Sequence, residues 1–563
     1  MPVRRCEDGV IPMTCEISIN NRKYMVSKDI TILEACEQAG MEIPTLCREA
    51  RRERPFTSCF ICVVEVEGFP RFAPACGTRV REGMKVRVDT DDIFKARKTG
   101  LELLLSDHNA DCKPPCHWKC PAHADVQGYV NAIADGEFKT SIEILRRRIP
   151  LPASLGRVCP HPCEDDCRRN HVDKAISIRN LKRFVADWDL ENGPFMPEVP
   201  HETGKKIAVV GGGPAGLSCA YYLRLQGHSV TIFDQMPALG GMLRYGIPEY
   251  RLPKSILDKE IASITGLGID VRTNHRLGDK VHLDDLEKDY DAVFLGIGAW
   301  KSKSLRLEGE DHPSIIGGID YLCDVAQGKP ANIGKEVIVV GGGNTAIDAA
   351  RVALRMGSNA TLLYRRTEEE MPAEDDEIRD AREEGVNFEF LAAPIGFRTE
   401  ENKMAALKCI RMELGEPDNS GRRRPRPIEG SEFELKADAV IKAIGQDIQK
   451  GIISEEQIDQ TKWGTVNVRM PIYMTNRKKV FAGGDLVKGP SLVVDAVYMG
   501  RKASEAIDCM LKGEVFPAEK DIVSTRRDVD DSLFTDVERA ERIEPEFMEP
   551  EMRKRNFAEV ALG

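Results

Sequence analysis

Two segments of the chain repeat one layout of strand, glycine-rich turn, helix and strand. The first begins at Ile207 and reads IAVVGGGPAGLSCAYYLRLQGHSVTIFD, and the second begins at Val337 and reads VIVVGGGNTAIDAARVALRMGSNATLLYRR. In each, glycines after a buried strand let the backbone turn tightly and approach a pyrophosphate at the N-terminus of the next helix. The repeat therefore predicts two dinucleotide sites in a doubly wound α/β region.

The glycine turns contain the candidate nucleotide-binding residues. In the first turn these are Gly211, Gly213, Pro214, Ala215 and Gly216. In the second turn they are Gly341, Gly343, Asn344 and Thr345. A third turn, FAGGD, offers Gly484 and Asp485 to a flavin ribityl chain or pyrophosphate, although this motif by itself is weak. The alternative for the first turn is a purely structural tight turn.

The residue that ends the second strand differs between the two copies. In the first copy, Asp234 can accept hydrogen bonds from both hydroxyls of an unphosphorylated ribose. In the second copy Tyr364 takes its place and is followed by Arg365 and Arg366, which can pair bidentately with a ribose 2′-phosphate. The second site is therefore expected to prefer NADPH to NADH. The alternative is that these two arginines are solvated charges at a strand end.

Composition excludes several classes of function. A chain of 563 residues is too long to fold around one hydrophobic core, so several domains are expected. The net charge of -11 leaves no global basic field, and we expect no nucleic-acid partner. No apolar stretch is long enough to span a bilayer, and the N-terminus lacks the apolar core of a secretory signal. We therefore expect a cytoplasmic protein without membrane insertion.

Cysteines crowd the first third of the chain. Thirteen of the 17 cysteines precede residue 170, which favours metal binding over a disulfide framework. Four of them lie in a segment whose short apolar strands and one helix predict a small mixed sheet, and they are Cys47, Cys59, Cys62 and Cys76. Four thiolates can hold a 2Fe–2S cluster, and tetrahedral zinc is the alternative.

These motifs together resemble known families. From Cys112 to about residue 512 the chain is similar to the small subunit of NADPH-dependent glutamate synthase and its relatives, on the pieces CPAHADVQGYV, GRVCPHPCEDDC, GGMLRYGIPEYRLPK and KAIGQ. Those relatives include dihydropyrimidine dehydrogenase and the large subunit of NADH-dependent ferredoxin:NADP oxidoreductase, an electron-bifurcating transhydrogenase. Residues 14–90 resemble the N-terminal 2Fe–2S ferredoxin domain of the complex I large iron–sulfur subunit and of iron hydrogenases.

The resemblance assigns the two nucleotide sites. It implies FAD at the first glycine turn and NADPH at the second. It further implies that Gly241 and Arg251 touch FAD, and that Ala443 and Gly445 approach the nicotinamide nucleotide. The alternative for Arg251 is a surface salt bridge.

The resemblance also implies two 4Fe–4S clusters on two loops of a helical segment. Only six cysteines are present there, namely Cys112, Cys116, Cys120, Cys159, Cys163 and Cys167. Two clusters with four ligands each need more than these, and Leu155 and Lys182 stand where relatives carry further ligands. His108 resembles a histidine that completes such a cluster in complex I, and His161 is a weaker candidate. Cys167 is expected to join the first loop's cluster.

The expected fold is multidomain α/β. Its predicted parts are a β-grasp 2Fe–2S ferredoxin domain (14–100), an α-helical 4Fe–4S domain (101–200), a Rossmann-like FAD domain in two parts (201–318 and 445–515), a Rossmann-like NADPH domain (319–444) and an extended C-terminal tail (516–563).

The cofactors, and not a general acid or base, are expected to carry the chemistry, so no catalytic side chain is predicted. NADPH delivers a hydride, an iron–sulfur cluster accepts one electron, and a flavin can do both. Glutamate synthase small subunits lack the 2Fe–2S domain, so the fusion favours the NADP(H)-reactive subunit of an electron-bifurcating transhydrogenase or of an NADP-linked hydrogenase or formate dehydrogenase complex. Expected partners are complex I-like flavin and iron–sulfur subunits, hydrogenase or formate dehydrogenase subunits, or ferredoxin. The alternatives are a glutamate synthase small subunit and a non-enzymatic electron-relay scaffold.

Overall fold

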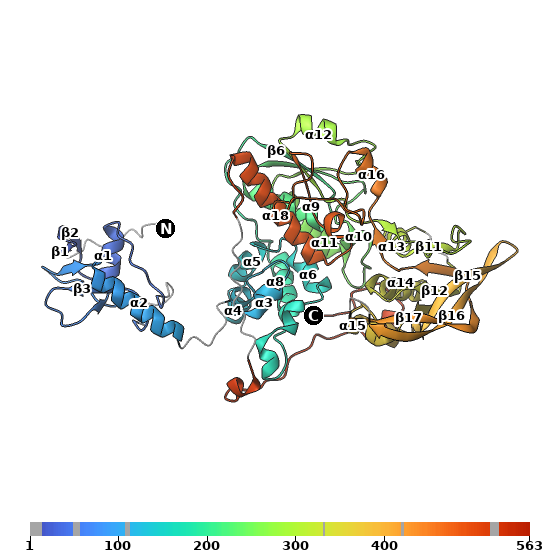
Figure 1. The fold of residues 1–563 in the computed structure, drawn as a ribbon, viewed down its shortest axis with the longest axis horizontal. Helices are drawn as coiled ribbons and strands as arrows, with labels where there is room; N and C mark the ends of the chain where they lie inside the picture. Colours follow the sequence, from blue (N-terminus) through green and yellow to red (C-terminus); the bar gives the residue numbers. More distant parts are fainter. Residues whose placement is uncertain (1–13, 49–56, 107–112, 330–332, 418–420, 518–528) are drawn as a thin grey trace. The chain divides into compact units, whose positions relative to one another are not determined.

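The computed structural model describes residues 14–48, 57–106, 113–329, 333–417, 421–517 and 529–563 (Figure 1). The chain divides into two compact units, residues 1–111 and residues 112–563, which we call the N-terminal and C-terminal units. The predicted positions His108 and Cys112 lie outside the described residues.

The N-terminal unit is built on one mixed sheet of order β2-β1-β5-β3-β4. Its strands are β1 (Thr14–Ile19), β2 (Arg22–Ser27), β3 (Val63–Val66), β4 (Ala73–Pro74) and β5 (Lys85–Arg87). Alternate side chains such as Ile17 and Ile19 are buried, as expected for a sheet with one face on the core. Helix α1 (Ile32–Gln38) begins with a capping box between Thr31 and Glu34.

Helix α2 (Asp91–Ser106) completes the N-terminal unit. Its Arg97 guanidinium donates to the Val63 carbonyl at 3.2 and 3.0 Å, and a side chain at Gly100 would lie 3.6 Å from the Cys59 carbonyl oxygen. The boundary predicted between residues 100 and 101 therefore falls inside this helix, because α2 packs against β3 and the cysteine loop.

The C-terminal unit begins with a helical part. Its helices are α3 (Pro115–Lys119), α4 (Val126–Ala134), α5 (Phe138–Arg146), α6 (Pro152–Val158), α7 (Pro162–Asp165), η1 (Arg168–His171) and α8 (Ile178–Glu191). Ile142, Leu145 and Val185 are fully buried in its core. Glu260 caps the N-terminus of α6 by accepting hydrogen bonds from the amides of Ala153 (2.6 Å) and Ser154 (2.8 Å). This contact ties the helical part to α11 (Lys254–Thr265) of the next part.

A parallel sheet of order β20-β9-β6-β7-β8 follows. Its strands are β6 (Lys206–Val210), β7 (Ser229–Phe233), β8 (Asp270–Arg272), β9 (Ala292–Leu295) and β20 (Val480–Ala482). The helices of this part are α9 (Pro214–Leu225), α10 (Met242–Tyr245), α11 (Lys254–Thr265), α12 (Leu283–Asp289), α16 (Lys450–Glu455), α17 (Asp485–Lys488) and α18 (Val493–Lys512). Because β20 pairs with β9, the chain returns to this sheet after building a second one.

The second parallel sheet has the order β11-β18-β12-β13-β14. Its strands are β11 (Ile315–Gly317), β12 (Glu336–Val340), β13 (Asn359–Tyr364), β14 (Asn387–Phe390) and β18 (Ala439–Lys442). Helices α13 (Gly318–Ala326), α14 (Asn344–Arg355) and α15 (Asp375–Glu384) and the turn η2 (Glu368–Glu370) belong to it. The short strands β10 (Lys301–Ser302) and β19 (Gln446–Asp447) pair where the chain passes between the two parts.

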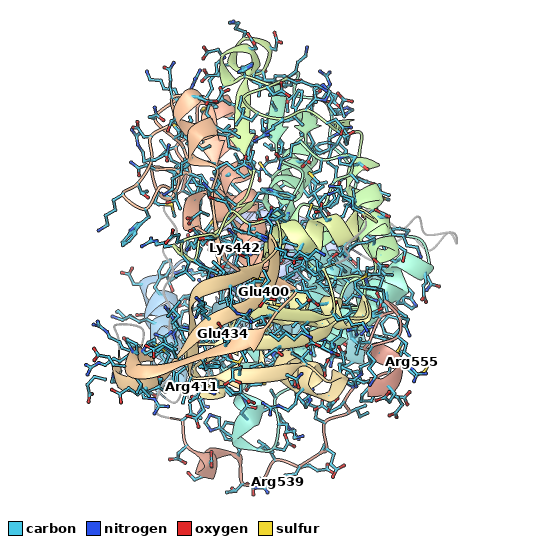
Figure 2. The ribbon with its side chains drawn as sticks, turned by 90° about the vertical axis from the view of Figure 1, so that its right-hand side faces the viewer. Glu400, Arg411, Glu434, Lys442, Arg539 and Arg555 are labelled. Atoms are coloured by element: carbon cyan, nitrogen blue, oxygen red, sulfur yellow. The ribbon has the colours of Figure 1, made fainter. Side chains whose placement is uncertain are left out.

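A three-stranded antiparallel sheet, unexpected from the sequence, is inserted between β14 and β18. Its strands are β15 (Ala392–Glu400), β16 (Lys403–Pro417) and β17 (Arg423–Lys436). Figure 2 shows this sheet with Glu400, Arg411 and Glu434 on its three strands. No fully buried residue lies in β17, and its first half, RRPRPIEG, lacks the apolar alternation that marks a strand.

The C-terminal residues 529–563, which we call the C-terminal strap, run back over the C-terminal unit with only η3 (Asp531–Phe534) and α19 (Pro550–Arg553) as helical turns. Arg542 pairs with Glu164 at 2.8 Å, and Arg157 pairs with Glu559 at 2.7 Å. Among the described residues, none of the helices combines the length and the apolar character needed to cross a membrane.

Candidate functional site

The first glycine turn has a backbone that only glycine tolerates. Gly211 has φ +104°, and a Cβ there would lie 2.5 Å from the Gly296 carbonyl oxygen. A Cβ at Gly216 would lie 1.8 Å from the Gly211 carbonyl oxygen. Helix α9 therefore packs directly on the turn, and its N-terminus, which opens with Pro214, borders a cavity. An exposed helix N-terminus of this kind binds a pyrophosphate.

This first cavity collects most of the residues predicted for FAD. Its lining includes Gly211, Gly213, Pro214, Ala215, Asp234, Gly241, Gly484 and Asp485. Gly216 packs behind the turn, as the contact above requires. Trp300 and Gln449 also line the cavity, and no sequence motif marked either of them.

Two buried carboxyl groups border the first cavity. Asp234 accepts hydrogen bonds from the amides of Gly212 (2.6 Å) and Met236 (2.7 Å), and burial raises the pKa of Asp234. Asp485 accepts hydrogen bonds from the Ser491 amide (3.1 Å) and hydroxyl (3.2 Å), and burial raises the pKa of Asp485 to about 6. Both are placed to accept hydrogen bonds from a ligand.

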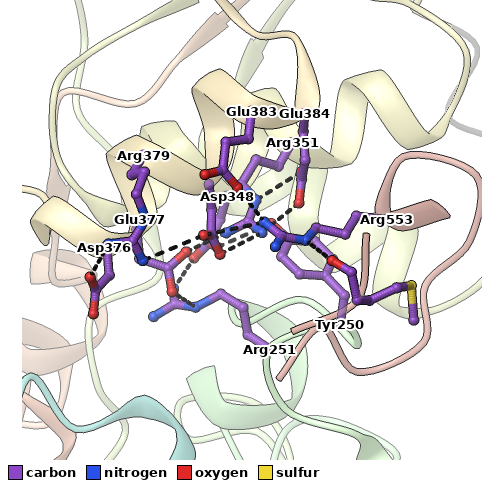
Figure 3. Close-up of polar contacts among 12 residues, drawn as sticks. Tyr250, Arg251, Asp348, Arg351, Asp376, Glu377, Arg379, Glu383, Glu384 and Arg553 are labelled. Atoms are coloured by element: carbon purple, nitrogen blue, oxygen red, sulfur yellow. Dashed lines mark hydrogen bonds and ion pairs between the residues drawn. The ribbon is translucent and has the colours of Figure 1, made fainter. Parts of the chain in front are cut away.

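Arg251 does not line the first cavity, although the resemblance placed it at FAD. Its guanidinium pairs with Asp348 at 2.8 Å and with Glu377 at 2.8 Å, and its side chain is 12% exposed. Figure 3 shows it beside Tyr250 in a network that continues to Arg351 on α14. The surface salt bridge offered as the alternative is wrong, because the pair is buried and joins the two nucleotide-binding parts. Arg251 borders a neighbouring cavity that Met242 and Asp485 also line, so its contact with FAD stays a prediction.

The second glycine turn has the same construction with one exchange. A Cβ at Gly341, where φ is +149°, would lie 2.2 Å from the Ala443 carbonyl oxygen. A Cβ at Gly342 would lie 2.5 Å from the Tyr364 ring. Tyr364 thus covers the turn at the place where, in the first copy, Asp234 holds the Gly212 amide.

A second cavity of about 560 Å³ lies over this turn. Of the predicted residues it is lined by Gly341, Gly343, Thr345, Arg365, Arg366, Ala443 and Gly445. Asn344 borders a neighbouring cavity, and its side-chain oxygen accepts a hydrogen bond from the Glu374 amide at 3.1 Å. Arg422 and Gln446 also line the second cavity, and sequence reasoning missed both.

The two predicted arginines occupy different environments. Arg365 is exposed at the cavity wall. Arg366 is only 5% exposed, and its Nε donates to the Arg423 carbonyl at 2.7 Å. Arg366 is therefore not a solvated strand-end charge, because it is buried and its hydrogen bond to Arg423 fixes the first residue of β17.

A central cavity of about 470 Å³ joins the parts of the C-terminal unit. Met242 and Asp485 reach it from the first cavity, and Thr345 and Gln446 reach it from the second. Cys159, at the end of α6, borders it from the helical part. One space therefore connects both nucleotide cavities with a cysteine loop.

In the N-terminal unit the four predicted thiols interact with one another. Burial raises the pKa of Cys47, but hydrogen bonds from Cys59 and Ser58 outweigh burial and lower it to about 7. Burial and a hydrogen bond with Cys62 raise the pKa of Cys76 to about 12, and Cys47 and Cys59 add to the rise. The four thiols thus act on one another electrostatically as one group.

In the helical part the cysteines of the two loops approach each other. Burial and the neighbouring Cys167 raise the pKa of Cys116 to about 11. Burial also raises the pKa of Cys163, with further contributions from Cys120 and Cys159. The two resulting groups overlap: Cys116 interacts with Cys167, Cys120 interacts with Cys159 and Cys163, and Cys116 also interacts with Cys120 and packs against the core that contains the second group.

The positions that lack an expected ligand lie beside the second of these groups. Leu155 is fully buried, and Lys182 is 6% exposed. Burial raises the pKa of the Cys120 and Cys163 thiols, and the positive charge of Lys182 offsets part of that rise. The Nδ1 atom of His161 is buried without a hydrogen-bond partner and lies 3.7 Å from Glu164. Among the described residues, no set of three or more His, Cys, Asp or Glu side chains forms a site for a metal ion. An iron–sulfur cluster is larger than a single metal ion, so the thiolates that bind its iron atoms lie farther apart than the ligands of one ion.

Three family models match the chain. The model of pyridine nucleotide-disulphide oxidoreductases matches residues 205–500. The model of dihydropyrimidine dehydrogenase domain II, 4Fe–4S cluster, matches residues 106–194. The model of the 2Fe–2S iron–sulfur cluster binding domain matches residues 13–91. The expected fold class and the cofactors FAD, NADPH, 2Fe–2S and 4Fe–4S are thereby confirmed, and the zinc alternative is wrong.

Curated relatives resemble the chain over most of its length. The beta subunit of the NADPH-Fe(3+) oxidoreductase of Geobacter sulfurreducens is 42% identical over 510 residues, which cover 84% of this chain and 76% of that protein. The beta subunit of the NADP(+)-dependent formate dehydrogenase of Moorella thermoacetica is 44% identical over 434 residues, covering 72% of this chain and 61% of that protein. The glutamate synthase [NADPH] small chain of Escherichia coli is 36% identical over 461 residues, covering 76% of this chain and 95% of that protein.

Proposed function

We propose that this chain, which belongs to the pyridine nucleotide-disulphide oxidoreductase family, is the NADP(H)-reactive subunit of an NADP-linked formate dehydrogenase or a closely related redox complex. The chain is an NADPH-dependent iron–sulfur flavoprotein oxidoreductase subunit. The observation that carries the proposal is the central cavity, where the second glycine turn and residues that also line the first cavity meet the Cys159 loop.

Each nucleotide turn would hold one dinucleotide. The first turn fits FAD, because its glycines leave room for a pyrophosphate at α9 and Asp234 can accept a ribose hydroxyl. The second turn fits NADPH, with Thr345 at the N-terminus of α14 and Arg365 at the cavity wall. When bound, FAD exchanges an electron pair with NADPH and single electrons with iron–sulfur clusters. The chain's own residues contribute binding and alignment across the central cavity.

The cysteines would hold the clusters. Cys47, Cys59, Cys62 and Cys76 suit the 2Fe–2S cluster, because the four thiols act on one another as one group. In the helical part, one cluster would use Cys116 and Cys167 with Cys112 and His108, and the other would use Cys120, Cys159 and Cys163. The second set has only three thiols, so its fourth ligand comes from elsewhere.

Exposed apolar side chains support transfer of electrons to a partner at the N-terminal unit. Leu46, next to Cys47, is 62% exposed, and Phe60, next to Cys59, is 54% exposed. Apolar side chains exposed beside redox thiols are typical of a docking surface.

The complex tests the proposal directly. A tagged chain is purified with its native partners, and NADP+ reduction is measured with formate, hydrogen and reduced ferredoxin as donors. Formate-dependent reduction is expected. No NADP+ reduction with any of these donors, together with NADPH oxidation that depends on glutamine and 2-oxoglutarate, would contradict the proposal in favour of a glutamate synthase. Reduction that needs ferredoxin and NADH together would favour an electron-bifurcating transhydrogenase.

The docking surface has a matched control. Phe60→Ser is expected to reduce partner-dependent turnover while leaving flavin reduction by NADPH unchanged. Met25→Ser removes an apolar side chain of 64% exposure on β2, away from the cysteine loop, and is expected to have no effect. Equal losses in both variants would contradict a docking role for Phe60.

A further inference from the structure

The turn after the second glycine site carries a run of acids that would repel a phosphate. It reads TEEE, and each carboxylate has a basic partner in the structure. Glu368 pairs with Arg382, and Glu370 pairs with Arg423 at 2.7 Å. Glu369 lies 3.8 Å from Arg423. Two arginines, one from α15 and one from β17, therefore offset most of the negative charge of these three acids.

The same contacts fasten β17 to the nucleotide site. Arg366 donates through Nε to the Arg423 carbonyl at 2.7 Å, and the Arg366 carbonyl accepts from the Leu391 amide at 3.2 Å. Arg423 in turn donates through Nε to Glu370 at 2.7 Å. Because these bonds hold both the backbone and the side chain of Arg423, the residue before it is also fixed in position.

That preceding residue is Arg422, which is partly buried and lines the second cavity together with Arg365. Arg365 directly follows β13, whereas Arg422 directly precedes β17, 57 positions further along the chain. The two arginines thus line one cavity from two separate parts of the chain.

We propose that Arg422, acting with Arg365, binds the 2′-phosphate of NADPH and sets the preference of this site for NADPH over NADH. The inference rests on the proposed NADPH function of the second glycine turn. The 2′-phosphate is the only group that distinguishes the two nucleotides, and guanidinium groups pair with phosphate through two parallel hydrogen bonds. Because the Nε of Arg366 donates to a backbone carbonyl, we assign the second phosphate-binding guanidinium group, beside that of Arg365, to Arg422.

The test compares nucleotide affinities of the FAD-loaded full chain. Dissociation constants for NADPH, NADH and 2′,5′-ADP are measured by calorimetry for the wild type and for Arg422→Ala. Loss of a charge-assisted hydrogen bond is expected to weaken NADPH and 2′,5′-ADP binding by about tenfold to a hundredfold. NADH binding is expected to stay the same, and Arg422→Lys to recover part of the loss.

Arg424→Ala is the matched control, because Arg424 is exposed on β17 and does not line the cavity. It is expected to leave all three affinities unchanged. Equal weakening of NADPH and NADH by Arg422→Ala would overturn the inference, since it would indicate a structural role, and so would unchanged affinities. Wild-type chain that binds NADH as tightly as NADPH would instead overturn the proposed function itself. Unchanged flavin absorbance verifies that each variant is folded.

Discussion

The buried pair between Arg251 and Asp348 allows a quantitative prediction. Asp348 is 3% exposed, and burial raises the pKa of its carboxyl group to about 6 even with Arg251 at 2.8 Å. Arg251→Met removes the cation and leaves Asp348 and Glu377 without that partner. Removing one partner of a buried pair lowers the free energy of unfolding by about 3–5 kcal/mol. We expect a loss of this size, with the FAD content unchanged.

Urea unfolding of the FAD-loaded chain measures this loss. Arg379→Met is the matched control, because Arg379 and Asp376 form a pair at 2.9 Å in which each side chain is 55% exposed. Such a pair contributes about 0–1 kcal/mol. Adding Asp348→Asn to Arg251→Met is expected to recover part of the loss, since it removes the uncompensated charge. Loss of FAD without loss of stability would refute the reasoning and return Arg251 to the flavin.

Three further predictions concern titration and the clusters. Burial raises the pKa of Asp380 from 3.8 to about 6, so the folded chain binds this proton more tightly and stability rises as pH falls through this range. Asp380→Asn is expected to flatten that slope in urea midpoints, and an unchanged slope would contradict it. Glu260→Gln weakens the cap of α6 by about 1–3 kcal/mol and is expected to lower the iron and sulfide content per chain, because α6 ends at Cys159. Lys182→Glu places a carboxylate where the second thiol group lacks a ligand, and it is expected to change one cluster signal in electron paramagnetic resonance.

Local patterns predicted much of the fold. The strands around Ile207 and Val337 are continuous apolar runs before glycines, and the structure shows why Gly211 and Gly341 must be glycine. The three-stranded sheet escaped prediction because β17 is rich in charge and only half-buried even on its inner face, where Phe433 and Leu435 pack against the core. The helix α2 crossed a predicted boundary because its packing against β3 depends on contacts distant in sequence.

The candidate site was predictable where it lies in consecutive residues. The glycine turns, with Asp234 and Arg365, belong to short motifs whose geometry is local. Arg422 lies in an arginine-rich hairpin, and only the fold brings it to the second cavity. Arg251 illustrates the converse, because its sequence context suggested a ligand contact while its real partners are on α14 and α15.

The most direct test of the account is an anaerobic titration of the purified chain with NADPH. Flavin absorbance and electron paramagnetic resonance are followed together, and NADH serves as the comparison. The account predicts that NADPH bleaches the flavin, that signals of reduced 2Fe–2S and 4Fe–4S clusters then appear, and that NADH at the same concentration has little effect. A flavin that does not respond to NADPH, or that responds equally to NADH, would contradict it.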